Sequence, residues 1–159
     1  MRYYTIQNNG ILIADTEEAL TRFYDNVLPL PEDYEKGKYI VVDGQLVLNP
    51  NWDVEQAQKR EADFKSKFFN IEGYGWYRKQ PKGYQSAVES MNVLFNVANV
   101  TDGIQAGLII FYQEPDYTKP EECTEEWLIE HQIIQGAMTK AEFMQLYVAF
   151  MTAWNTEEH

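Results

Sequence analysis

The sequence predicts an α+β protein in which a small N-terminal αβ unit, residues 1–50, precedes a mainly helical C-terminal lobe, residues 51–159. An Asp43-Gly44 pair between two apolar runs is a strong signal for a β-hairpin. Several later stretches repeat apolar residues every three or four positions, which is typical of amphipathic helices. A chain of 159 residues that is 45% apolar and 14% aromatic is long and apolar enough to bury a core, as one domain or two small lobes.

The N-terminal unit is predicted to have the order ββαββ, with two hairpins and one helix. The first hairpin joins β-prone runs at 3–7 and 11–14 through Asn8-Asn9-Gly10, residues that tolerate positive φ. The second joins 39–42 and 45–48 through the Asp-Gly turn.

The helix between the two hairpins is predicted over about 16–26. Asp15 and Glu18 have capping-box spacing, and Ala19, Leu20 and Phe23 share one face. Pro29 and Pro31 are expected to end this segment.

A linking helix is predicted over 53–69, beginning at the capping-box spacing of Asp53 and Gln56. One face carries an apolar stripe: Val54, Ala57, Phe64 and Phe68. The other face is charged with mixed sign and is expected to be solvated, with ion pairs four residues apart: Glu55, Lys59, Arg60, Asp63 and Lys67.

The C-terminal lobe is predicted to contain three more helices, at 86–99, 124–135 with Gly136 as the stop signal, and 139–154. Their expected caps are Ser86, Thr124 and Thr139, and Glu89 and Glu142 complete the capping-box spacing of the first and the last. A buried strand or a short core segment is expected at 107–112, before a loop at 114–122. The last helix repeats six large apolar residues, which are consistent with either a core or a self-association seam. The sequence therefore leaves a homo-oligomer open.

The segment 73–85, GYGWYRKQPKGYQ, is the local exception in a chain of net charge -12. Residues 1–72 carry 13 acidic and 8 basic side chains, residues 73–102 carry 2 and 3, and residues 103–159 carry 10 and 2. Aromatic residues and arginine are enriched at protein interfaces, and similar clusters stack on sugars or bases. The predicted binding surface is Tyr74, Trp76, Tyr77, Arg78, Lys79, Lys82 and Tyr84. A structural interpretation stands beside it, in which the aromatics anchor a tight hairpin and the cations pair with the protein's own carboxylates.

No catalytic residue, cofactor or metal site is predicted. Cys123 and His131 are eight residues apart, roughly 12 Å along a helix, which is too far for a hydrogen bond; His159 is terminal. The glycines match no phosphate-loop pattern and Glu130-His131 lacks zinc-protease spacing. A single cysteine excludes an internal disulfide and suits a reducing compartment, and no apolar run has the length of a signal-peptide core or a membrane span.

Acidic residues gather in a second candidate surface: Glu114, Asp116, Glu121, Glu122, Glu125, Glu126 and Glu130. They are interpreted first as a solvated face that favours a helix N-terminus, because hard cations need ligands that converge from a loop or several elements. The overall acid excess disfavours direct binding to nucleic acid or to a membrane.

The block PEDYEKGKYIVVDGQLVLNPN at 31–51, with the helix start that follows it to residue 59, resembles small proteins encoded in the tail modules of phages and prophages of gut Gram-positive bacteria. Phe68-Phe69, the run from Gly75 to Lys79, and FMTAWN at 150–155 are also similar to that family. The resemblance implies a tail-associated or fibre-adjacent accessory without defined catalytic residues, located in the bacterial host cytoplasm or incorporated in the virion.

The sequence thus favours a non-enzymatic phage or prophage protein that acts by protein–protein contact in tail assembly or structure. The alternative is an acidic phage-encoded inhibitor of a host defence nuclease, in which the acidic surface imitates a nucleic acid. A carbohydrate-binding module that uses Trp76 is the third hypothesis.

Overall fold

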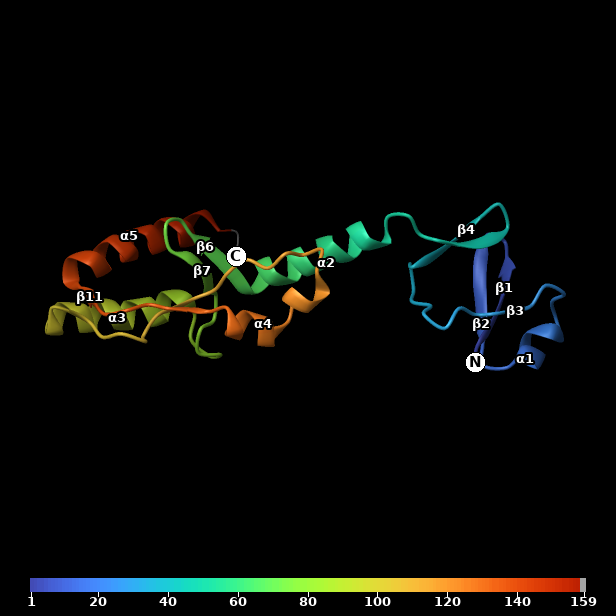
Figure 1. Cartoon of the computed structure of the whole chain (residues 1–159), viewed down its shortest axis with the longest axis horizontal. Coiled ribbons are helices and arrows are strands. Elements are labelled where there is room, and N and C mark those ends of the chain that lie inside the picture. Colours follow the sequence, from blue (N-terminus) through green and yellow to red (C-terminus); the bar gives the residue numbers. More distant parts are fainter. Residues whose placement is uncertain (158–159) are drawn as a thin grey trace. The chain divides into compact units, whose positions relative to one another are not determined.

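A computed structural model describes residues 1–157, and the predicted α+β class is confirmed (Figure 1). The chain forms two compact units, Met1–Glu55 and a second unit that begins at Gln56. The boundary falls within helix α2, Trp52–Lys67. His159, considered above as a catalytic candidate, lies outside the described residues.

The first unit is built from two small antiparallel sheets. A three-stranded sheet has the order β2-β1-β3 and a two-stranded sheet pairs β4 with β5. The strands are β1 Tyr3–Gln7, β2 Gly10–Ala14, β3 Leu28–Pro29, β4 Tyr39–Val42 and β5 Gln45–Leu48. Both predicted hairpins form, with positive φ at Asn8, Asn9, Asp43 and Gly44 in their turns.

All elements of the predicted order ββαββ form, and an additional short strand, β3, follows the helix and pairs with Tyr3 and Tyr4. Helix α1 covers only Glu17–Thr21, and Thr16 caps it in place of Asp15 by accepting from the Ala19 backbone N–H at 3.3 Å. Since the helix ends at Thr21, Phe23 leaves the predicted apolar face and is exposed. Pro29 is tolerated in β3 because that strand lies at the edge of the sheet.

The second unit combines α2 with three further helices and six short strands. The helices are α3 Ala87–Thr101, α4 Glu125–Glu130 and α5 Lys140–Thr156, with a 3-10 turn η1 at Pro120–Glu122. The strands pair as β6 Phe68–Ile71 with β7 Gly75–Arg78, β8 Gly103–Ile104 with β11 Met138–Thr139, and β9 Ile110–Phe111 with β10 Ile133–Ile134.

Helices α3, α4 and α5 start at the predicted caps, whereas α2 starts at Trp52, so Asp53 lies inside its first turn and is not the cap. Ser86 accepts from the Glu89 N–H at 3.2 Å at the start of α3, and Thr124 accepts from the Trp127 N–H at 3.2 Å at the start of α4. Thr139 and Glu142 form a complete capping box at the start of α5.

Two predicted helix ends are wrong. Helix α2 ends at Lys67, because the next residues belong to strand β6. The side chains of Phe68 and Phe69 lie on opposite faces of that strand, and both are buried. Helix α4 stops at Glu130 and not at Gln135, because Ile133 and Ile134 pair with β9. Gly136 is therefore not a helix stop.

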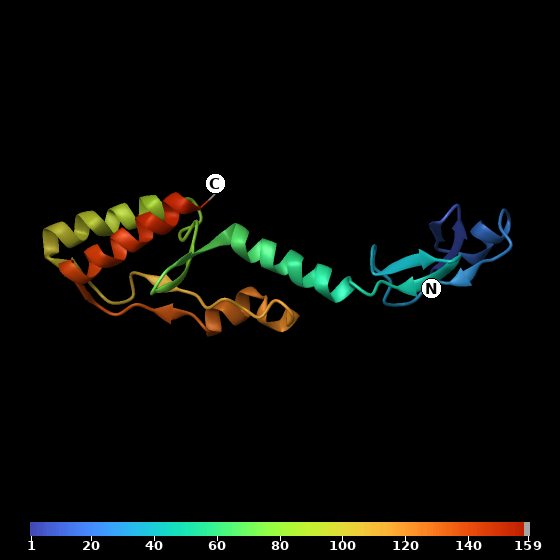
Figure 2. The same ribbon diagram turned by 90° about the horizontal axis from the view of Figure 1, so that it is seen from above.

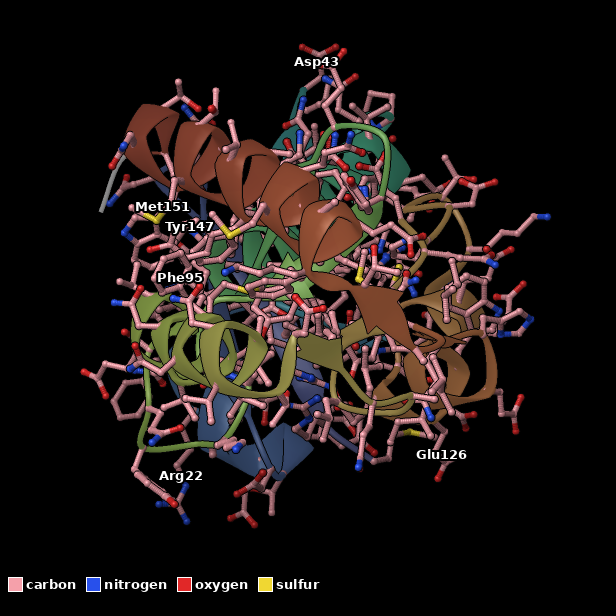
Figure 3. The ribbon with its side chains drawn as sticks, turned by 90° about the vertical axis from the view of Figure 1, so that its left-hand side faces the viewer. Arg22, Asp43, Phe95, Glu126, Tyr147 and Met151 are labelled. Carbon is pink, nitrogen blue, oxygen red and sulfur yellow. The ribbon has the colours of Figure 1, made fainter. Side chains whose placement is uncertain are left out.

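The largest core lies where α3 and α5 pack side by side and against β6 (Figures 1 and 2). Phe143, Leu146 and Phe150 of α5 are fully buried in it. Figure 3 shows Phe95 of α3 and Tyr147 of α5 close to each other, and their ring centroids are 4.8 Å apart. The apolar spacing of the last helix therefore describes a core face in this structure.

Candidate functional site

The segment 73–85 contains the β6–β7 turn, strand β7 and the loop into α3. Strand β7 bonds on its other side to Tyr112, with Trp76 N–H donating to the Tyr112 carbonyl at 3.1 Å and the reverse bond at 2.7 Å. Gly75 has a φ of 138° and passes close to Phe111, whose Cβ would lie 3.3 Å from an added Cβ. The backbone of β7 is thus held on both sides.

The aromatic residues of this segment differ in their exposure. Tyr77 is only 4% exposed and packs edge-on with the rings of Phe69 and Phe150, with centroids 6.0 and 5.9 Å away. Burial raises the pKa of Tyr77 to about 12, helped by the nearby Tyr112. Tyr77 is therefore a core residue and is not accessible as part of the predicted binding surface.

Tyr74 and Trp76 are half-buried. Tyr74 packs near Phe111 at 6.0 Å, and Trp76 lies edge-on to Phe64 at 5.1 Å. These contacts match the structural interpretation, in which the aromatics anchor the hairpin. They leave Trp76 only partly accessible for stacking on a sugar.

Arg78 and Lys79 pair with the protein's own carboxylates. Arg78 forms an ion pair with Glu125, donates from Nε to the Tyr112 hydroxyl at 3.1 Å, and places its guanidinium 4.7 Å from the Tyr112 ring centroid. Burial lowers the pKa of Arg78, but these hydrogen bonds outweigh it and the net pKa is raised. Lys79 pairs with Glu157 at 2.8 Å.

Lys82 and Tyr84 remain on the surface, and Tyr84 is 85% exposed. Lys82 lines a groove of about 280 Å³ together with Arg78, Val93 and Leu108. The accessible part of the predicted binding surface is therefore the loop at 82–84.

The predicted acidic surface is partly neutralised. Glu125 pairs with Arg78, Glu122 accepts from the Asp116 N–H and pairs with Lys119, and Asp116 accepts from Thr118. The remaining members are exposed, among them Glu126 (labelled in Figure 3): Glu114, Glu121, Glu126 and Glu130.

Cys123 and His131 have separate partners. The Cys123 thiol contacts the Asp116 carbonyl at 3.6 Å. The pKa of this thiol is raised, mainly because the thiol is partly buried. His131 stacks on Trp127 at 4.2 Å and donates from Nδ1 to the Trp127 carbonyl at 2.9 Å. Among residues 1–157, no three His, Cys, Asp or Glu side chains are grouped so as to hold a metal ion, and no helix has the length and apolarity to cross a membrane.

One surface that sequence reasoning missed lies on the β4–β5 hairpin. Ile40 pairs with Val47 and Val42 with Gln45, so these four side chains share one face. Ile40, Val42 and Val47 are 36%, 45% and 36% exposed. The run YIVV at 39–42 could have indicated this surface, because a strand that is apolar at every position places apolar side chains on both of its faces.

Comparison with known proteins found no matching family model, no matching curated protein and no matching solved structure.

Proposed function

We propose that the protein acts by protein–protein contact in phage tail assembly or structure, and that the β4–β5 hairpin presents the contact surface. The observation that carries this proposal is the exposed apolar face of Ile40, Val42 and Val47. When a partner covers exposed apolar surface, the complex gains about 25 cal/mol for each Å² that is removed from water.

The first unit has little core of its own to stabilise that hairpin. Within Met1–Glu55 the buried side chains are Tyr4, Thr5, Leu20 and Leu30, and none of them lies in β4 or β5. Two-stranded hairpins are marginally stable alone, and units of this size commonly need a partner or a cross-link. A partner that packs on the hairpin would supply the missing apolar contacts.

The kind of partner follows from the block at 31–59, which resembles tail-module proteins and contains this hairpin. A tail component encoded beside this protein is therefore the proposed partner. The site of action is the bacterial host cytoplasm during assembly, or the virion itself.

The test is co-purification with the neighbouring tail proteins, using Val42→Lys as the interface variant. Val148→Lys is the matched control, because Val148 is 62% exposed on α5 and the substitution makes the same change in charge. We expect Val42→Lys to lose the partner and Val148→Lys to retain it. Equal binding by both variants, or no partner among the tail proteins, would refute the proposal.

Inhibition of a host defence nuclease is the second candidate, and the four exposed glutamates Glu114, Glu121, Glu126 and Glu130 support it. It predicts salt-sensitive binding to a basic nuclease, since charge pairing across an interface weakens with ionic strength. Glu126→Lys should then reduce binding while Val42→Lys leaves it unchanged, which is the opposite of the first proposal.

A further inference from the structure

A cavity of about 350 Å³ lies in the second unit between helix α2 and the segment 115–128. Its size is in the range of small-molecule and side-chain binding sites. The helix contributes one face, with lining residues at spacings of three and four: Gln56, Lys59, Arg60, Asp63, Phe64 and Lys67. The face that the sequence suggested was solvated thus borders a concave site.

The floor of the cavity is apolar. Phe64, Phe68 and Leu128 line it and are nearly inaccessible, and Pro115 is also buried. An apolar group in the cavity contacts only the small part of these side chains that is accessible, which is 5% for Phe64 and 6% for Leu128, and the gain is in proportion to that area.

The polar lining has a positive balance in a strongly acidic protein. Three cations, Lys59, Arg60 and Lys67, and two carboxylates, Asp63 and Glu125, line the cavity, which leaves one positive charge. The two carboxylates are already paired, Asp63 with Lys67 at 3.3 Å and Glu125 with Arg78.

Arg60 supplies hydrogen-bond donors at the cavity. Arg60 is held by a bond from Nε to the Tyr117 carbonyl at 3.1 Å, and that bond leaves its two terminal amino groups as further donors. Gln56 also lines the cavity, but its Nε2 is covered by the protein itself and does not reach a group bound there.

We propose that this cavity binds an apolar group that carries a carboxylate, either a small organic acid or the carboxyl end of another chain. The apolar part contacts Phe64 and Leu128, and the carboxylate accepts from the terminal amino groups of Arg60. The planar guanidinium matches a carboxylate through parallel hydrogen bonds. This inference does not rest on the proposed role of the β4–β5 hairpin, and Val42→Lys should leave it unaffected.

Binding is measured by calorimetry with 3-phenylpropanoate and with its neutral amide, 3-phenylpropanamide. Cys123 lines the same cavity and is the only cysteine of the chain, so protection of its thiol from iodoacetamide reports occupancy directly. We expect the acid to bind and to slow alkylation, and the amide to bind about tenfold more weakly or worse, because a hydrogen bond to a charged group is lost. Equal binding of acid and amide, or no binding of the acid, would overturn the proposal.

A variant of Arg60 tests the assignment, and its melting temperature separates binding from folding. Arg60→Gln should weaken binding about tenfold or more. Lys65→Gln is the matched control, because Lys65 lies on the same helix, outside the cavity lining, and pairs with Glu61. Unchanged affinity of Arg60→Gln, at an unchanged melting temperature, would contradict the assignment.

A second arm identifies the source of the carboxylate. A short peptide ending in phenylalanine is compared as the free acid and as the C-terminal amide. Tighter binding of the peptide acid than of 3-phenylpropanoate assigns the site to a chain end, and binding of the small acid alone assigns it to a small molecule; both outcomes support the shared chemistry.

Discussion

Phe150 offers the most direct test of how α5 holds the second unit together. Its side chain is fully buried, and its ring lies 5.5 Å from Phe69 and 5.9 Å from Tyr77. Truncating a fully buried phenylalanine to alanine costs about 3–5 kcal/mol, which combines lost transfer free energy with a residual cavity. Aromatic neighbours at these distances place Phe150→Ala in the upper part of that range, at about 4 kcal/mol.

The free energy of unfolding is measured by urea denaturation with tryptophan fluorescence. Trp76, Trp127 and Trp154 all lie in the second unit, so the signal mainly follows that unit. With an m-value of about 1.5 kcal/mol/M, the urea midpoint of Phe150→Ala should fall by roughly 2.5 M.

Val148→Ala is the control on the same helix, because Val148 is mostly exposed; its change should stay within about 0.5 kcal/mol. Removing α5 by truncation after Gln135 should abolish the cooperative transition, since Phe143, Leu146 and Phe150 are lost together. A midpoint shift below 0.5 M for Phe150→Ala, or a truncated chain that unfolds like the full length, would show that α5 is peripheral to the fold.

Three further predictions concern Arg78, Tyr77 and the start of α5. Arg78→Met should cost about 1–2 kcal/mol through lost ring contacts and the hydrogen bond to the Tyr112 hydroxyl. The double-mutant cycle with Glu125→Gln should give a coupling energy below about 1 kcal/mol, because the Glu125 side chain is 57% exposed. A larger coupling would show that the ion pair dominates. Since burial raises the folded-state pKa of Tyr77 from 10.0 to about 12, its contribution is fully present below pH 10 and is lost as pH rises through 12. The free energy of unfolding should therefore fall by about 2–3 kcal/mol more over that window in the native protein than in Tyr77→Phe, measured by urea denaturation at each pH; parallel pH profiles would contradict this. Thr139→Ala should cost about 1 kcal/mol by breaking the capping box. Thr152→Ala, which removes only a bond to a carbonyl within the helix, should be near neutral in the same denaturation assay.

The candidate surfaces were only partly predictable. The composition of 73–85 marked it as unusual, but the partners of Arg78 are 34 and 47 residues away in the chain. No local pattern shows whether such a cation faces solvent or a carboxylate from another element. Likewise, the charged face of α2 has the spacing of a solvated helix, and only the segment 115–128 packed near it forms a cavity there.

The sequence by itself determined the features that depend on neighbouring residues: both Asn-Gly-type and Asp-Gly hairpin turns, and the caps at Ser86, Thr124 and Thr139. Turn dihedrals and cap hydrogen bonds are satisfied within about four residues, so the local sequence is sufficient to specify them. Only the tertiary structure decided where α2 and α4 end, that β3 joins the first sheet, and that Tyr77 is buried while Tyr84 is exposed. Those outcomes depend on pairing and packing between segments that are distant in the chain. A short stretch of sequence does not show the free energy of such contacts.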